Sequence, residues 1–242
     1  MSALGAQTRA ELRLTLRRGE SLLLIVAIPV GLLVFFSLVD VLPEPSGYRH
    51  AVDFLSPGVL ALAVMSTSMV SLAIATGFER QYGVLKRLGT TPLGRPRLLA
   101  AKAASTAAVE ALQVAILVAV ALALGWDPAG RPALAVAAVA LATVGFAGLG
   151  LLMAGLFPAE VTLAAANGLY LALLLLGGMV FPLTKLPHGL RRVAEALPAG
   201  ALSDALHGSL TAGGAIPGRA WVVLAAWAVV TPVAAALTFR WE

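Results

Sequence analysis

Cysteine is absent from the 242 residues, and charged residues are scarce at 12%. The absence of cysteine excludes a small secreted domain held together by disulfides. Soluble domains carry about 25% charged residues, so this low charge excludes a water-soluble globular domain. A disordered chain is excluded as well, because disorder requires low hydrophobicity and 60% of the residues are hydrophobic. The composition therefore predicts an integral membrane protein, and the length predicts one transmembrane domain over residues 1–242.

Motifs that carry catalytic chemistry are also missing. The sequence contains no G-x-x-x-x-G-K-[ST] loop, so we expect the chain not to hold ATP phosphates itself. The three histidines, His50, His188 and His207, fall in predicted outer loops and are too scattered to form a metal site. No predicted span contains a histidine base for an intramembrane serine protease. We therefore expect no metal site and no enzyme, but a chain that moves or seals something.

Six apolar stretches are long enough, or nearly so, to cross a bilayer as helices. About 20 residues, at a rise of about 1.5 Å each, cover the roughly 30 Å hydrocarbon layer. The third stretch qualifies if one carboxylate, Glu110, is tolerated inside the membrane. The predicted fold is an all-α integral membrane bundle whose spans cover residues 21–41, 54–77, 103–125, 133–157, 161–182 and 220–240.

The loops differ in their content of basic residues, and this difference predicts the orientation. Most of the 17 lysines and arginines fall in the amino-terminal segment and in the loop after the second span. Loops rich in these residues stay in the cytoplasm, so we expect both termini to be cytoplasmic. The loop bias also explains the net charge of +5 without nucleic-acid binding. No Ala-x-Ala site follows the first apolar run, which favours a span over a cleaved signal peptide.

Residues 3–18 have the pattern of an amphipathic helix. An apolar arc is formed by Leu4, Thr8, Leu12, Thr15 and Leu16. Beside it lies a basic stripe of Arg9, Arg13 and Arg17. This pattern is typical of a helix in the headgroup plane whose arginines reach lipid phosphates. The alternative is an extra charged turn of the first span.

The loop at residues 79–92 predicts a short cytoplasmic helix. The pattern supports a helix from Glu79 to Leu88, with Gly89 as its left-handed cap and Pro92 preventing continuation. Its predicted apolar face consists of Val84, Leu85 and Leu88. The basic residues around that face are Arg80, Lys86 and Arg87. Such a helix suits docking in a groove of another protein, and the alternative is a solvated basic loop.

Polar residues within the predicted spans are candidates for lining a conduit. They are Ser66, Thr67, Ser71, Glu110, Gln113, Asn167 and Tyr170. A carboxylate at depth must face protein or water, because facing lipid costs several kcal/mol. The alternative for Glu110 and Gln113 is hydrogen bonding between helices, and serine and threonine often bond a neighbouring backbone. The glycines of the fourth span, Gly145, Gly148, Gly150 and Gly155, predict tight helix packing.

The loop residues resemble a motif of the membrane-spanning subunits of ABC type-2 exporters. The matching positions are Glu79, Arg80, Gly83, Leu85, Leu88, Thr91 and Pro92, with Lys102 at the start of the third span. Gln81 and Val84 depart from the usual pattern. A second matching motif includes Gly178, Phe181, Pro182, Pro187 and Pro198. The resemblance extends over the whole chain.

The resemblance implies a fold and partners. It implies that the loop at residues 79–92 couples the spans to a cytosolic ABC ATPase subunit, which binds the ATP and magnesium. It implies a second permease, either another copy or a related chain, in a bacterial cytoplasmic membrane, and a cargo path along the second and fifth spans. In the outer segment 183–218, it implies short helices that re-enter the membrane. Apolar positions such as Leu190 and Leu202 agree with two short helices there, and the alternative is that these helices rest on the outer surface.

The functional hypothesis is therefore the membrane subunit of an exporter, driven by a separate ATPase. One alternative is a stand-alone secondary transporter or channel, for which the single carboxylate Glu110 is weak support. Another alternative is a membrane assembly or lipid-handling factor. The cargo is not predicted by these residues.

Overall fold

The computed structural model describes residues 3–17, 19–39, 51–89, 94–179, 187–211 and 213–240. Within these ranges all regular structure is helical and no strand occurs, which confirms the predicted all-α membrane class. The helices are α1 (Ala3–Arg17), α2 (Gly19–Leu38), α3 (Ala51–Met65), η1 (Ser66–Ser71), α4 (Leu72–Gln81), α5 (Val84–Gly89), α6 (Arg95–Ala123), α7 (Pro132–Leu156), α8 (Ala159–Leu176), α9 (His188–Ala196), α10 (Pro198–Leu210) and α11 (Gly218–Thr238).

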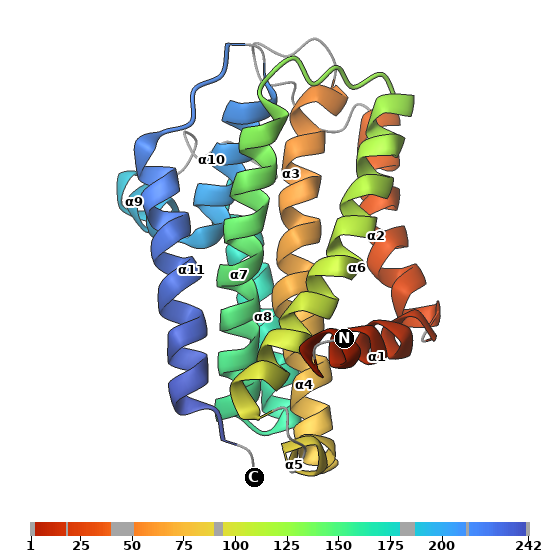
Figure 1. Cartoon of the computed structure of the whole chain (residues 1–242). Coiled ribbons are helices and arrows are strands. Elements are labelled where there is room, and N and C mark those ends of the chain that lie inside the picture. Colours follow the sequence, from red (N-terminus) through yellow and green to blue (C-terminus); the bar gives the residue numbers. More distant parts are fainter. Residues whose placement is uncertain are drawn as a thin grey trace.

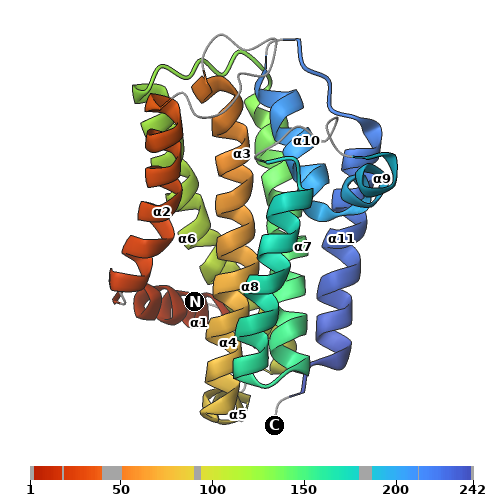
Figure 2. The same ribbon diagram turned by 180° about the vertical axis from the view of Figure 1, so that it is seen from behind.

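The long helices run side by side in one bundle. In Figure 1, α2, α6, α3, α7 and α11 run roughly along the vertical axis, and α8 is seen in front of the bundle in Figure 2. Helix α1 lies across this axis, in the half of the bundle that ends with α5 and the C-terminus. The short helices α9 and α10 lie toward the other end. The two ends of the bundle therefore carry different short helices, α1 and α5 in one half and α9 and α10 in the other.

Among the described residues, five helices are long and apolar enough to cross a membrane. They are Ala51–Gln81, Pro96–Ala123, Pro132–Leu156, Ala159–Leu176 and Gly218–Thr238. These correspond to five of the six predicted spans. The remaining one, predicted at residues 21–41, overlaps α2, whose described apolar part Ile25–Leu38 is shorter. The sixth span and the location of the termini thus stay predictions.

The second predicted span changes its helical type midway. Helix α3 passes without a break into the π-helix η1, which continues as α4. A π-helix is rare and is usually a single wide turn inserted into an α-helix, often at a functional site. Among the described helices, three contain an internal proline: Pro29 in α2, Pro57 in α3 and Pro232 in α11. Each proline removes one backbone N–H from its helix.

Glycines let α7 lie close to its neighbours, as the sequence predicted. A Cβ added at Gly148 would be 2.5 Å from the backbone nitrogen of Pro232 in α11. A Cβ at Gly150 would be 2.6 Å from the carbonyl oxygen of Met69 in η1. Any larger residue would push these helices apart, so α7 packs tightly against both.

Two clusters of buried apolar side chains hold the bundle together. The larger cluster joins α3, α7 and α10 and contains Met65, Phe146 and Leu202. The smaller cluster lies at the end that carries α5 and contains Leu85 and Leu98. Helix α5 is therefore packed onto the bundle by its own side chain.

The outer segment contains two helices, α9 and α10. Most of α10 is buried, and it packs against α3, α7 and α11. On α9 the predicted apolar residues divide, because Ala194 is buried while Leu190 and Val193 are exposed. His207 lies inside α10, the second of the two short helices predicted for this segment. Whether the two helices re-enter the membrane stays a prediction.

Candidate functional site: the turn between α4 and α5 and a cavity among the helices

The predicted coupling helix is divided into two helices by a turn. Helix α4 ends at Gln81, and Gly83 follows in the left-handed region with φ +70°. Glycine adopts this conformation without a steric penalty, so it ends α4 and starts α5. The predictions of one continuous helix from Glu79 to Leu88, and of Gly89 as its left-handed cap, were therefore wrong, because Gly89 lies within α5. Thr91 and Pro92 lie outside the described residues.

The α5 side chains separate into an inner and an outer group. Leu85 is fully buried and Leu88 packs beside it, since residues three positions apart share a helix face. Val84 is exposed, so of the predicted apolar face only Leu85 and Leu88 pack against the bundle. The other exposed side chains of this tip are Tyr82 (70% exposed), Lys86 and Arg87. Tyr82 was not predicted as part of the site, although its place in the turn could have indicated it.

Arg80 fastens α4 to the end of α7. Its Nη1 atom donates a hydrogen bond of 2.6 Å to the carbonyl of Gly155, and Nη2 donates one of 2.6 Å to the carbonyl of Phe157. A third contact of 3.4 Å reaches the carbonyl of Arg240 after α11. A guanidinium at a helix C-terminus satisfies unpaired carbonyls and interacts favourably with the helix dipole. Arg80 thus positions helices.

Glu79 belongs to a buried ion cluster. Lys102 of α6 is only 3% exposed and forms an ion pair with Glu79. Its Nζ also lies 3.2 Å from Oε1 and 3.3 Å from Oε2 of Glu11 in α1. One ammonium group therefore joins α1, α4 and α6. Glu11 was not predicted, although it is the one acidic residue in the sequence of α1.

Gln81 makes the third connection from the end of α4. Its Nε2 donates a hydrogen bond of 2.7 Å to Oε1 of Glu160 in α8. Three consecutive residues, Glu79, Arg80 and Gln81, therefore bond to different helices. The base of the α4–α5 turn is joined to most of the bundle, so a displacement of α5 would be transmitted to these helices.

The predicted conduit residues divide into two groups, of which the first lines a cavity. The cavity has a volume of about 270 Å³ and lies among α2, α3, η1 and α8. Its lining consists of Ile25, Ile28, Pro29, Leu32, Val59, Leu62, Ser66, Val70, Asn167 and Tyr170. All of these residues are uncharged. Asn167 donates a hydrogen bond of 2.8 Å to its own helix at Leu163, which leaves its side-chain oxygen for other donors.

The second group is buried between helices and does not line this cavity. Thr67 donates a hydrogen bond of 2.7 Å to Oε1 of Gln113. Glu110 accepts one of 2.5 Å from Thr143 of α7, a partner that the sequence did not reveal. Within the described chain, the other carboxyl oxygen of Glu110 has no hydrogen-bond partner. These contacts favour the interhelical alternative, and Ser71 is half-buried outside the cavity lining.

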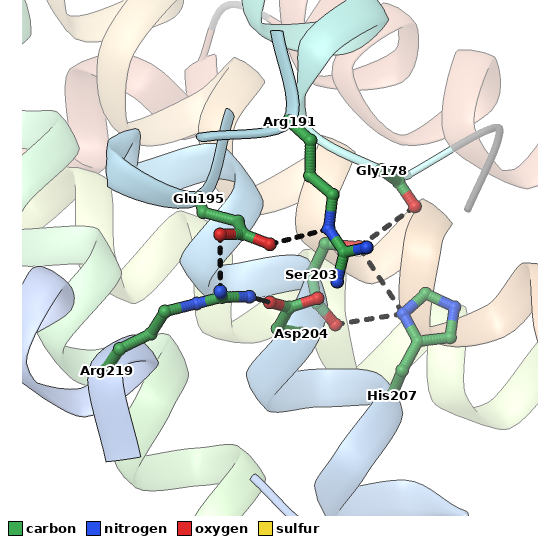
Figure 3. Close-up of polar contacts among 7 residues, drawn as sticks. All are labelled: Gly178, Arg191, Glu195, Ser203, Asp204, His207 and Arg219. Carbon is green, nitrogen blue, oxygen red and sulfur yellow. Dashed lines mark hydrogen bonds and ion pairs between the residues drawn. The ribbon is translucent and has the colours of Figure 1, made fainter. Parts of the chain in front are cut away.

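Ion pairs join the helices at the end of the bundle that carries α9 and α10 (Figure 3). Arg219 of α11 bonds to Glu195 of α9 at 2.5 Å and to Asp204 of α10 at 3.1 Å. Arg191 adds a 2.8 Å bond to Glu195. The hydrogen bond from Arg191 is the largest cause of a lowered pKa of Glu195, and the bond from Arg219 adds to it. The arrangement holds α9, α10 and α11 together.

The predicted prolines of this outer segment mark helix starts. Pro187 is the residue before α9, and Pro198 is the first residue of α10. Phe181 and Pro182 lie outside the described residues. Ser203 of α10 donates a hydrogen bond of 3.1 Å to the carbonyl of Gly178, after α8 (Figure 3). In the described ranges, no three His, Asp or Glu side chains are grouped so that they could hold a metal ion.

The comparisons with known proteins identify a family. No curated protein sequence matches the chain. The model of the family described as ABC-2 type transporter matches residues 2–210. This match confirms the resemblance that was predicted from the segment between the second and third spans. The chain belongs to the ABC-2 type transporter family, and it is the transmembrane subunit of an ABC-type transporter rather than a catalytic subunit.

Proposed function

We propose that this chain forms the conduit of an exporter, and that a separate cytosolic ABC ATPase subunit drives it. ATP and Mg²⁺ would be bound by that partner, since this sequence has no phosphate-binding loop. A second permease, identical or related, completes the membrane part. In this proposal α2 is a sixth span, both termini are cytoplasmic, and α9 and α10 re-enter the outer leaflet of a bacterial cytoplasmic membrane.

The observation that carries this proposal is the construction of the α4–α5 turn. Its tip presents Tyr82, Lys86 and Arg87 at the surface, while its base is bonded to several helices through Glu79, Arg80 and Gln81. An exposed tip with an aromatic ring and basic groups has the chemistry of an interface. The anchored base gives the partner's movement a direct route into α1, α6, α7 and α8.

The cavity between α2 and α8 is the candidate cargo site. Its lining is apolar apart from Ser66, Asn167 and Tyr170. An ion entering it would lose its hydration without gaining a charged partner, which costs several kcal/mol. The proposed cargo is therefore an uncharged, largely apolar molecule that carries a hydrogen-bonding group.

The partner is tested by reversing one charge at the tip. Arg87→Glu should abolish most of the co-purification of the ABC ATPase when the tagged chain is isolated from its host. Arg192→Glu is the matched control, since Arg192 is an exposed arginine on α9 at the other end of the bundle. Equal ATPase recovery with both variants would overturn the assignment of the tip.

A secondary transporter is the second candidate, and Glu110 favours it. This carboxyl is 2% exposed and lies within a span, bonded to Thr143, and ionisable groups in membranes often carry protons. Transport by the purified chain alone under a proton gradient, lost in Glu110→Gln, would support this candidate. Transport that requires the ATPase and ATP, and that persists in Glu110→Gln, would exclude it.

A further inference from the structure

A proline inside α2 leaves one backbone carbonyl without its usual partner. Pro29 has no N–H, so the carbonyl of Ile25, four residues earlier, cannot receive the hydrogen bond that an α-helix normally supplies. The side chain of Gln113 in α6 takes that place. Its Nε2 donates a hydrogen bond of 2.7 Å to the Ile25 carbonyl.

The same amide holds the π-helix of the second span. Oε1 of Gln113 accepts a hydrogen bond of 2.7 Å from Thr67, which lies in η1. Gln113 and Thr67 are each 1% exposed, so water does not compete for these bonds. One buried amide therefore joins two irregular places, the proline site of α2 and the wide turn of η1.

These two places are walls of the cavity. Ile25 and Pro29 line it from α2, and Ser66, next to Thr67, lines it from η1. Gln113 is not among the lining residues. We propose that Gln113 is a positioning residue that fixes the separation of these two walls, and through it the size of the cargo that the cavity accepts. This inference rests on the proposed function, which assigns the cavity to cargo.

The hydrogen-bond arrangement predicts how variants combine. Gln113→Leu has a similar volume and removes both bonds, leaving the Ile25 carbonyl without this partner. Pro29→Ala restores an N–H that can bond to this carbonyl within α2. In the Pro29→Ala background the Ile25 carbonyl no longer depends on Gln113, so Gln113→Leu should have much less effect there.

The first test measures the wall separation in the chain alone. Because the chain has no cysteine, Leu32→Cys in α2 and Asn167→Cys in α8 provide two spin-label sites at the cavity. Distances are measured by electron-electron resonance in nanodiscs. We expect Gln113→Leu to shift or broaden the distance distribution, and to do so by less than half as much when Pro29→Ala is present.

Thr143→Val is the control for this measurement, because it also removes a buried hydrogen bond to α6, the one to Glu110. It should leave the distribution unchanged. An unchanged distribution in Gln113→Leu, or an equal change in the control, would overturn the inference. So would equal effects of Gln113→Leu with and without Pro29→Ala.

The second test uses the complex with its ATPase and the uncharged dye Nile red as probe. Gln113→Leu should change the half-saturating dye concentration on the order of tenfold. The maximal ATPase rate should stay within about twofold, because the variant alters the binding of the dye and leaves the chemical step of ATP hydrolysis unchanged. Thr67→Ser keeps the hydroxyl and should resemble the native complex. A purely structural role would instead lower the maximal rate with the amount of folded protein.

The two tests separate the inference from the proposed function. If the dye neither binds to nor stimulates the native complex, the cargo assignment of the cavity fails, while the distance measurement still decides whether Gln113 positions the walls. If the distances respond as expected but dye affinity does not, Gln113 does not set cargo size and the inference is overturned.

Discussion

At the scale of single residues, Lys102 carries an ammonium group that is almost entirely removed from water. This group forms ion pairs with the carboxylates of Glu11 and Glu79. A buried ammonium is retained only if its lost hydration is offset by such partners. Its position between α1 and α4 explains why a lysine stands inside the α6 helix, where an apolar side chain would otherwise pack.

Lys102→Met is therefore expected to destabilise the protein strongly. Removing one member of a buried ion cluster typically costs about 3–5 kcal/mol, since the remaining charges lose their partner. The measurement is the free energy of unfolding in mild detergent. Arg97→Met, at an exposed position of α6, should change it by less than about 0.5 kcal/mol. Similar losses in both variants would contradict the structural role of the cluster.

His207 makes stability depend on pH. Its ring nitrogens lie 2.9 Å from the Ser203 carbonyl and 3.1 Å from the Phe54 carbonyl, and removal from water lowers its pKa. The unfolded chain takes up a proton near about pH 6.5, and the folded protein does so only at lower pH. The stabilising contribution is therefore complete above about pH 6.5 and is lost as the pH falls through the folded pKa.

The melting temperature should consequently fall more between about pH 7.5 and 5 in the native protein than in His207→Gln, whose amide does not titrate. A parallel fall in both proteins would show that other groups cause the acid sensitivity. A steeper fall in His207→Gln would contradict a lowered pKa of His207 in the folded protein.

At the scale of elements, the α4–α5 turn depends on the conformation of one glycine. Gly83 has φ +70° and open space around its Cα, so a methyl group there meets no atom but forces a strained backbone. Gly83→Ala should cost about 1–2 kcal/mol in the native turn. We expect α5 to shift and ATPase recovery in co-purification to fall.

Gly168→Ala is the matched control, because Gly168 also has open space but lies in α8 with an ordinary helical backbone. It should leave ATPase recovery unchanged and raise helix stability slightly, by about 1 kcal/mol or less. Loss of the ATPase in both variants, or in neither, would contradict the role of the turn.

Helix packing provides a second prediction at this scale. Gly148→Ala places a methyl group against the backbone of Pro232 in α11, which cannot move without displacing that helix. Overpacking of this kind costs about 1–3 kcal/mol, and thermal unfolding would record it. Gly31→Ala, at a position with open space in α2, should not reduce stability. Equal effects would mean that α7 and α11 do not pack as described.

The elements could largely be predicted from the sequence, because long apolar stretches determine helices that cross a membrane. The partners of polar side chains could not. Gln113 and Glu110 share a helix face, but only the fold shows that one meets Thr67 and the other Thr143. The glycine that ends α4 was also misplaced, since both Gly83 and Gly89 suit a helix end and tertiary contacts decide between them.

At the scale of the whole molecule, the two ends of the bundle differ in the polar contacts that join their helices. At the α5 end, charged and polar side chains join α1, α4, α6, α7 and α8 around one exposed turn. At the other end, Arg219 and its partners hold α9 and α10 against α11. Between these ends lies an uncharged cavity. The chain is the transmembrane subunit of an ABC-type transporter, and this arrangement supports the proposal that a partner acts on its α5 end.

The central claim is that the α5 tip touches an ABC ATPase. The most direct measurement is photo-crosslinking in native membranes, with p-benzoylphenylalanine at Tyr82 and, as the control, at Val193 on α9. The account predicts that the Tyr82 probe captures an ATPase subunit and that the Val193 probe does not. An ATPase-free product at Tyr82, or labelling of Tyr82 from outside the cell, would contradict it.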